Sequence, residues 1–132
     1  MSQENVEVVR RAHGTLARGD SEGFVREMTE DVEGMSRVMA VEGVTYRGHD
    51  GMRRFVDEMR SVFPDFRSEV VRVVEGDDVV VAELRFGGTG ARSGLATEGR
   101  TWQALILRDG RICSWRAYET EAEALEAVGL SE

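Results

Sequence analysis

The sequence predicts an α+β fold for a single domain, residues 1–132, in which a curved antiparallel sheet wraps around helices from the first half of the chain. In that first half, apolar residues recur every three or four positions, as they do on one face of an amphipathic helix. From residue 66 onward they alternate with a period of two, which is typical of half-buried strands, and short turn sequences separate these segments. Helices that precede a run of strands favour an α+β arrangement.

Two helices are expected at the N-terminal end. The first covers Glu4–Arg18, where apolar residues and His13 share one face, and the glycine after Arg18 ends it. A second, short helix follows, because either Asp20 or Ser21 can accept backbone hydrogen bonds as its N-cap. Its apolar side would hold Phe24, Val25 and Met28.

The segment between the second and third helices has the weakest pattern. Glycines and methionines interrupt Val32–Tyr46, which is interpreted as one irregular strand and a loop. A turn at Tyr46–Gly51 follows, and Asp50 within it is expected to cap a third helix that Pro64 ends. The apolar face of this helix would hold Met52, Phe55, Val56 and Met59.

Four strands are expected after the third helix, because valine, isoleucine, leucine and aromatic residues dominate four runs. These runs are Phe66–Val74, Val79–Phe86, Leu95–Leu107 and Arg111–Tyr118. Gly76–Asp78 and Arg108–Gly110 are short turn sequences that indicate hairpins. Gly87–Gly94 is interpreted as a longer loop, and it is not a phosphate-binding loop, because no helix follows it and the chain has no lysine.

A short helix is expected at the C-terminal end. Thr120–Glu123 has the capping-box pattern, and Gly129 is placed to end the helix. Leu125 and Val128 would form its apolar side.

The strand segment Thr101–Leu107 is largely apolar on both faces. One face holds Trp102, Ala104 and Ile106, and the other holds Thr101, Gln103, Leu105 and Leu107. In so small a domain, helices on one face and a partner chain on the other would cover such a strand, so the pattern predicts a homodimer through the outer face of the sheet. The alternative is that a loop or the terminal helix covers that second face.

Composition argues against two classes of partner. The net charge is −8 at pH 7 and every basic residue is an arginine, whereas nucleic-acid binding needs a clustered basic surface, so no nucleic-acid partner is expected. No run approaches the roughly 18 apolar residues that span a membrane. The N-terminus also lacks the basic start and apolar run of a signal peptide, so a cytoplasmic protein with no membrane partner is expected.

No metal and no cofactor are expected. The two histidines, His13 and His49, are 36 residues apart, and no carboxylates with zinc-ligand spacing accompany them. Cys113 stands alone in an apolar run and is interpreted as a small buried hydrophobe rather than a reactive thiol.

Several short motifs follow one another along essentially the whole chain. They are Val8–His13 followed by Arg18–Asp20, Tyr46–Gly51, Phe63–Phe66, Leu107–Ile112 and Glu121–Leu130. In this order and spacing they resemble the SnoaL-like branch of the nuclear-transport-factor-2-like (NTF2-like) superfamily. The resemblance implies a cone, in which a bent antiparallel sheet is closed by three helices around a mostly apolar pocket, with frequent dimerisation through the outer sheet face. It implies less about chemistry, because this fold hosts ketosteroid isomerases, polyketide cyclases, epoxide hydrolases, dehydratases and non-catalytic binders.

The resemblance also implies which positions would hold reacting groups. The tyrosine donor of ketosteroid isomerases aligns with Ala12, their carboxylate base with Ser36, and an acid that they share with polyketide cyclases with Gln103. The acid of the Trp-Arg-Asp-Tyr run of epoxide hydrolases aligns with Ala117. A glutamine can donate a hydrogen bond but cannot exchange a proton at neutral pH. The acids that these reactions need are therefore absent from the aligned positions.

The same resemblance places a set of candidate residues around the pocket. His13 is the candidate general acid or base, Gln103 would orient an oxygen, and Glu119 would hold the imidazole. The apolar wall would comprise Leu16, Phe55, Met59, Leu105 and Trp115. Strand alternation puts Cys113, Trp115, Ala117 and Glu119 on the pocket face. The alternatives are an ordinary buried histidine at position 13 and a solvent-exposed Glu119.

Two functions remain open at this stage. The favoured one is a non-catalytic pocket that binds a small hydrophobic molecule. The alternative is a cofactor-free isomerase, cyclase, dehydratase or hydrolase that acts on a small oxygenated hydrophobic substrate, with His13 transferring the proton. The missing acids favour the first.

Overall fold

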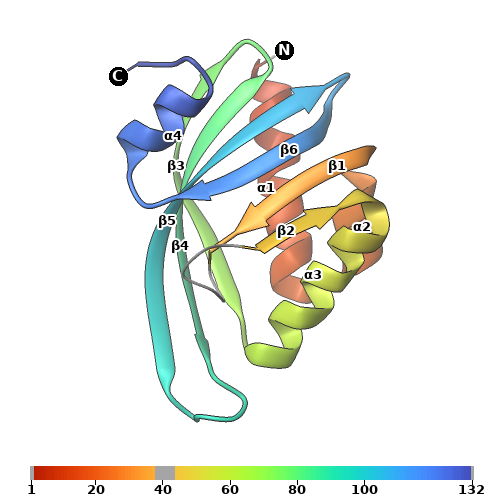
Figure 1. The fold of residues 1–132 in the computed structure, drawn as a ribbon, viewed down its shortest axis with the longest axis vertical. Coiled ribbons are helices and arrows are strands. Elements are labelled where there is room, and N and C mark those ends of the chain that lie inside the picture. The colour runs from red at the N-terminus through yellow and green to blue at the C-terminus, as the bar shows by residue number, and fades with distance from the viewer. Residues whose placement is uncertain (1, 38–43, 132) are drawn as a thin grey trace.

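The computed structural model describes residues 2–37 and 44–131. In them one curved sheet bends around the first three of four helices (Figure 1). The helices are α1 (Ser2–Arg18), α2 (Ser21–Arg26), α3 (Gly48–Val62) and α4 (Glu121–Ala127). The strands are β1 (Met28–Ser36), β2 (Val44–Arg47), β3 (Arg67–Gly76), β4 (Val79–Thr89), β5 (Ala96–Arg108) and β6 (Arg111–Tyr118). This arrangement confirms the predicted α+β fold, with three helices in the N-terminal half, one curved sheet and a short helix at the end.

In the described residues the strands form one sheet in the order β2-β1-β6-β5-β4-β3. The strands β3 to β6 are a meander of antiparallel neighbours, and β2 is antiparallel to β1. The strands β1 and β6 run parallel, so the expectation of an antiparallel sheet is corrected at this one pair. The parallel pair joins the N-terminal half of the chain to the meander, and no local sequence pattern reports it.

The first two helices end and begin as their sequence signals indicate. After α1, Gly19 takes a φ of 71°, and its N–H donates to the Leu16 carbonyl at 3.0 Å. This left-handed conformation suits glycine, which has no Cβ. The Asp20 carboxylate then accepts a 2.9 Å hydrogen bond from the Gly23 N–H and caps α2, so Asp20 is the cap rather than Ser21.

The start of α3 differs from the prediction. Its N-cap is Arg47, whose side chain makes no capping hydrogen bond, and Asp50 lies inside the first turn. There the negative charge of the Asp50 carboxylate interacts favourably with the positive end of the helix dipole. The carboxylate also accepts a 2.8 Å hydrogen bond from Arg53. Gly48, with a φ of 69°, makes the sharp change of direction from β2 into α3. Tyr46 belongs to β2 rather than to a turn, and it is 1% exposed.

The segment interpreted as one irregular strand and a loop contains two strands. The first of them, β1, starts at Met28, which therefore belongs to the sheet and not to the second helix. The rest of the predicted loop, residues 38–43, lies outside the described residues. Along β1, Val32, Gly34 and Ser36 are the buried alternate positions. Because two of these three residues are not apolar, the period of two is invisible in the sequence.

The glycine-rich loop is shorter than predicted. The strand β4 continues to Thr89, and β5 starts at Ala96. Opposite Phe86 in the ladder lies Gly99, where any side chain would collide with the Phe86 ring. The glycine thus lets the aromatic ring lie across the neighbouring strand.

The main hydrophobic core fills the space between the first three helices and the concave face of the sheet. Its centre is Phe55 of α3, whose ring contacts Phe24 of α2, Tyr46 of β2 and Trp115 of β6, with ring centroids 5.0 to 6.0 Å apart. Tilted and edge-on aromatic contacts of this kind stabilise a core beyond the area that they bury.

The C-terminal helix covers part of the other face of the sheet. Ala124 and Leu125 of α4 pack against Val81 of β4 and Ala104 of β5 in a second, smaller core. The alternative that the terminal helix covers the second face of Thr101–Leu107 therefore holds at Ala104. Ile106, farther along the same strand, stays 40% exposed. The homodimer through the uncovered part of this face stays a prediction.

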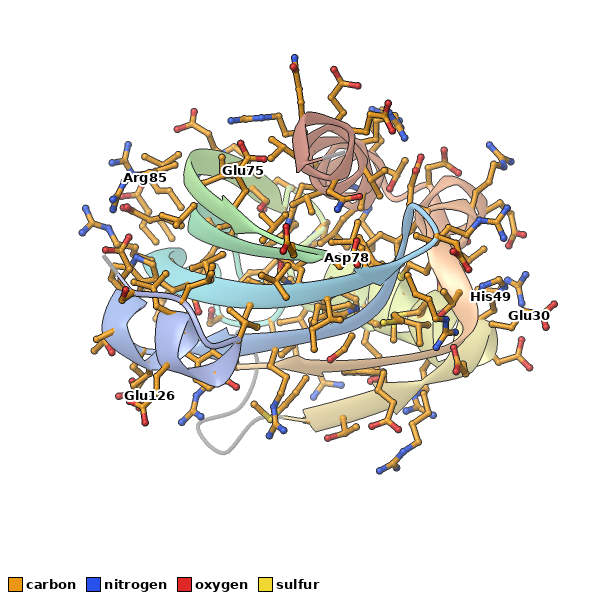
Figure 2. The ribbon with its side chains drawn as sticks, turned by 90° about the horizontal axis from the view of Figure 1, so that it is seen from above. Glu30, His49, Glu75, Asp78, Arg85 and Glu126 are labelled. Atoms are coloured by element: carbon orange, nitrogen blue, oxygen red, sulfur yellow. The ribbon has the colours of Figure 1, made fainter. Side chains whose placement is uncertain are left out.

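Charged side chains lie around the outside of the molecule. Figure 2 shows Glu30, Arg85 and Glu126 at its periphery, pointing away from the sheet and helices. Among the described residues, no helix is long and apolar enough to cross a lipid bilayer.

Candidate functional site

A small cavity of about 50 Å³ lies between the helices and the concave face of the sheet. Its wall comes from the three N-terminal helices and from every strand except β2. Most lining residues are apolar, and the polar ones are His13, Ser36, Ser68, Thr101 and Gln103. None of the lining residues in the described part of the chain is an acid or an arginine.

A hydrogen bond of 2.9 Å joins Nε2 of His13 to Oε1 of Gln103 in the cavity wall. Each of the two side chains is 8% exposed. An amide oxygen can only accept, so Nε2 carries the ring proton and donates it to this bond. The other ring nitrogen of His13, Nδ1, is buried and has no hydrogen-bond partner among the described residues. Since a neutral imidazole has one N–H, Nδ1 is an unused acceptor.

Local sequence explains how these two side chains meet. His13 and Leu16 are three residues apart on α1 and therefore share its buried face. Gln103 lies in the middle of β5, and its neighbours in the ladder are Ala82 of β4 and Ala117 of β6. Because both neighbours are small, the amide side chain has room to extend from the sheet to the helix.

Burial lowers the pKa of His13 from its ordinary value of 6.5, because a charged imidazolium would lose its hydration. The bond to the Gln103 carbonyl oxygen acts in the opposite direction but more weakly. His13 is therefore neutral at pH 7, and its ring can act as a hydrogen-bond acceptor or a base but not as an acid.

We expect the free energy of unfolding to decrease below about pH 6.5 because of His13. The unfolded chain binds the imidazole proton near its ordinary pKa, whereas the folded protein binds it at lower pH, so stability is lost as the pH falls through this window. Urea unfolding at pH 7.5 and 5.5 measures the effect, and the protein should lose more stability over that interval than its His13→Asn variant. Equal losses would contradict a buried, neutral ring.

All five predicted wall residues line the cavity. They are Leu16, Phe55, Met59, Leu105 and Trp115. The positions that the resemblance assigns to reacting groups also lie on its wall, namely Ala12, Ser36, Gln103 and Ala117. At those positions the wall therefore presents two methyl groups, a hydroxyl and an amide.

Glu119 is not part of the cavity, so this part of the prediction is wrong. It follows the last residue of β6, and its side chain is 75% exposed, with the carboxylate 3.5 Å from Arg37. Strand alternation does not extend to Glu119, because the strand ends at Tyr118. Glu119 therefore cannot hold the imidazole of His13, and the solvent-exposed alternative holds.

Cys113 also does not line the cavity, because β6 contains a bulge. Ile106 pairs with Ser114 and Leu107 with Ile112, which leaves Cys113 without a partner in the ladder. The bulge turns Ile112 into the cavity wall, where it is 1% exposed, and leaves Cys113 half-buried rather than fully buried. Partial burial raises the pKa of the Cys113 thiol, which favours the unreactive protonated form.

Trp115 forms one wall of the cavity, and Gly34 allows it to lie there. The indole Nε1 donates to Sδ of Met52 at 3.4 Å. Gly34 pairs with Trp115 across the parallel strands, and a Cβ at this glycine would overlap the indole ring. Gly34 was not among the predicted site residues, although a glycine inside a strand often marks a close approach of this kind.

The described residues contain no group of three or more histidine, cysteine or acidic side chains that could hold a metal ion. A cavity of about 50 Å³ also has no room for a nucleotide-sized cofactor.

Comparison with known proteins supplies a family. The family model described as the SnoaL-like domain matches residues 9–115, which include most of the cavity wall. No protein with a curated description gives a significant match.

Solved structures share the fold along almost the whole chain. A candidate SnoaL-like polyketide cyclase from Jannaschia sp. CCS1 has a TM-score of 0.78 at 18% identity, over 100% of this chain and 96% of that one. An NTF2-like protein of unknown function from Burkholderia pseudomallei has a TM-score of 0.77 at 19% identity, over 96% and 97%. A protein with a ketosteroid isomerase-like fold from Catenulispora acidiphila, solved in complex with trimethylamine, has a TM-score of 0.78 at 15% identity, over 95% and 94%. At these identities the likeness shows the fold alone.

Proposed function

Because the chain belongs to the SnoaL-like domain family, we propose that it binds a small, neutral, largely apolar molecule in its cavity and does not react with it. The fold of this family carries many different chemistries, so the function depends on the groups that line the cavity. Those groups support binding better than catalysis.

The uncharged wall supports this proposal most directly. The tyrosine donor of the reactions known for the fold would stand at Ala12 and their acids at Ser36, Gln103 and Ala117, and none of these four side chains exchanges a proton at neutral pH. His13 is held neutral by burial. A charged ligand would lose its hydration without gaining an opposite charge from the described wall, whereas a neutral apolar ligand would not.

The volume of the cavity limits the size of the ligand. A cavity of about 50 Å³ holds about three to five water molecules, which corresponds to a compact molecule or to one end of a longer one. Met28 and Met59 line it, and their flexible side chains can adjust to an irregular apolar shape. The ligand is therefore expected to be compact at its buried end.

Thermal unfolding with a panel of neutral compounds tests the proposal. The panel contains toluene, phenol and cyclopentanol beside steroids, terpenoids, polyketide-like aromatics and epoxides. At one hundred times its Kd, a ligand stabilises the native state by about 2.7 kcal/mol and raises the Tm by several degrees. We expect this rise with compact members of the panel.

Two matched valine variants locate the binding site. Ala117→Val fills the cavity from β6 and should abolish the rise in Tm. Ala96→Val makes the same change at an exposed position of β5 and should leave the rise intact. No rise with any compound, or a rise that survives Ala117→Val, would contradict binding in this cavity.

The second candidate function is proton transfer by His13. It is favoured by the buried Nδ1, which has no hydrogen-bond partner in the part of the chain that the structure describes. The neutral ring would begin as the base, and Gln103 would orient an oxygen of the substrate. The protein would then be a cofactor-free isomerase, cyclase, dehydratase or hydrolase. Product that forms in the same mixtures with the wild type, but not with His13→Asn, would favour this function over binding alone.

A further inference from the structure

We infer that the cavity selects ligands with a hydroxyl group and that this hydroxyl donates its hydrogen bond to Nδ1 of His13. The inference rests on the proposed function and names the class of ligand, which is a small alcohol or phenol with an otherwise apolar body. It also predicts that a ketone or an ether of the same shape binds more weakly.

The first step is the assignment of the ring proton. Oε1 of Gln103 lies 2.9 Å from Nε2 of His13 and can only accept, so the proton is on Nε2. Nδ1 of the neutral ring then offers a lone pair. A buried acceptor without a donor destabilises the protein, and donors from a ligand or a solvent molecule are the ways to satisfy it.

The second step is that two hydroxyl groups close to His13 and Gln103 in the sequence have other partners. Thr15, two residues after His13, donates to the Ala12 carbonyl at 2.7 Å. Thr101, two residues before Gln103, donates to the Tyr118 carbonyl at 3.0 Å. Neither proton is available to Nδ1, and no other group of the described residues donates to it.

The third step is the match between this acceptor and the ligand. An alcohol places one O–H donor in an apolar setting, and a hydrogen bond in such a setting is stronger than in water. A carbonyl or ether oxygen carries only lone pairs, so it would face the lone pair of Nδ1 without a hydrogen atom between them. The wall therefore discriminates by hydrogen-bond polarity as well as by size.

Matched probes test the inference by titration calorimetry at pH 7.5. Cyclopentanol and cyclopentanone share a ring, and phenol and fluorobenzene share another, so each pair differs mainly in the donor. We expect each hydroxyl compound to bind about tenfold more tightly than its partner, as one net hydrogen bond allows. In the double variant with His13→Phe and Gln103→Leu, which removes both ring nitrogens and also the amide oxygen that the ring change alone would free, the two members of each pair should bind with equal affinity.

Nitrogen NMR of the histidine side chains gives a readout that does not depend on the stability of a variant. Cyclopentanol should shift the resonance of the unprotonated Nδ1 of His13, whereas cyclopentanone should leave it in place. A protonated Nδ1 in the free protein would overturn the assignment of the ring proton.

The outcomes separate the inference from the proposed function. If the ketone and fluorobenzene bind as tightly as the hydroxyl compounds or more tightly, the hydroxyl selectivity is wrong while cavity binding stands. If toluene and the larger apolar compounds bind but no hydroxyl compound does, the same conclusion follows. If no compound binds at all, both the inference and the proposed function are wrong.

Discussion

Replacing Gly34 by alanine is expected to destabilise the protein by about 3 kcal/mol and to abolish ligand binding. Gly34 is buried in β1, with Tyr46 on one side and Trp115 on the other, and an added Cβ would overlap the indole. The indole cannot move away easily, since Trp115 is 3% exposed and its ring packs against Phe55. The strand or the indole must therefore shift, and a displaced indole changes the cavity that it lines. Urea unfolding measures the first effect, and thermal unfolding with ligand measures the second.

Two further variants show whether the collision is the cause. Gly14→Ala makes the same change on α1, where the new Cβ would meet only the flexible end of Arg18 at 3.3 Å, and it should stabilise the protein by about 0.5 to 1 kcal/mol. Trp115→Phe removes the part of the indole that Gly34 contacts, so combining it with Gly34→Ala should cost less than the sum of the two single changes. A loss below about 0.5 kcal/mol in Gly34→Ala would contradict the close packing of the two residues.

The meander β3 to β6 was predictable because its signals are local. Residues that alternate in polarity and turns such as Asp109-Gly110, where both residues have positive φ, need no information from distant parts of the chain. The parallel pairing of β1 with β6 is different, because it depends on contacts between distant segments. Glycine and serine at its buried positions Gly34 and Ser36 also hide the pattern that would have identified β1.

The candidate site was predictable wherever a regular helix or strand places the residue. His13 and Leu16 follow the helical repeat, and Gln103 and Leu105 follow the strand repeat, so all four lie at the cavity as expected. Cys113 and Glu119 were misplaced because strict alternation was extended through a bulge and past the end of β6. A bulge shifts the facing of every residue beyond it by one position, and nothing in the local sequence indicates where it lies.

Breaking the pair of His13 and Gln103 is expected to cost stability, whereas removing both members is not. Gln103→Leu would leave the buried Nε2–H of His13 without its acceptor, and His13→Phe would leave Oε1 of Gln103 without its donor. Each single change should lower the free energy of unfolding by about 1 to 3 kcal/mol. The double variant replaces two buried polar groups by apolar ones in an apolar wall, so its stability should be close to that of the wild type. Urea unfolding of the four proteins at pH 7.5 gives the coupling between the two residues.

The result of this cycle separates a structural role from a functional one. If the double variant is about as unstable as either single variant, the hydrogen-bonded pair stabilises the fold, and its place in the cavity wall needs no ligand to explain it. If the double variant is as stable as the wild type, the pair contributes nothing net to folding, because apolar side chains fill its place equally well. The second ring nitrogen has no partner among residues 2–37 and 44–131, so the pair then matters for what the cavity binds. The double variant should lose the tenfold preference for hydroxyl compounds without losing the fold.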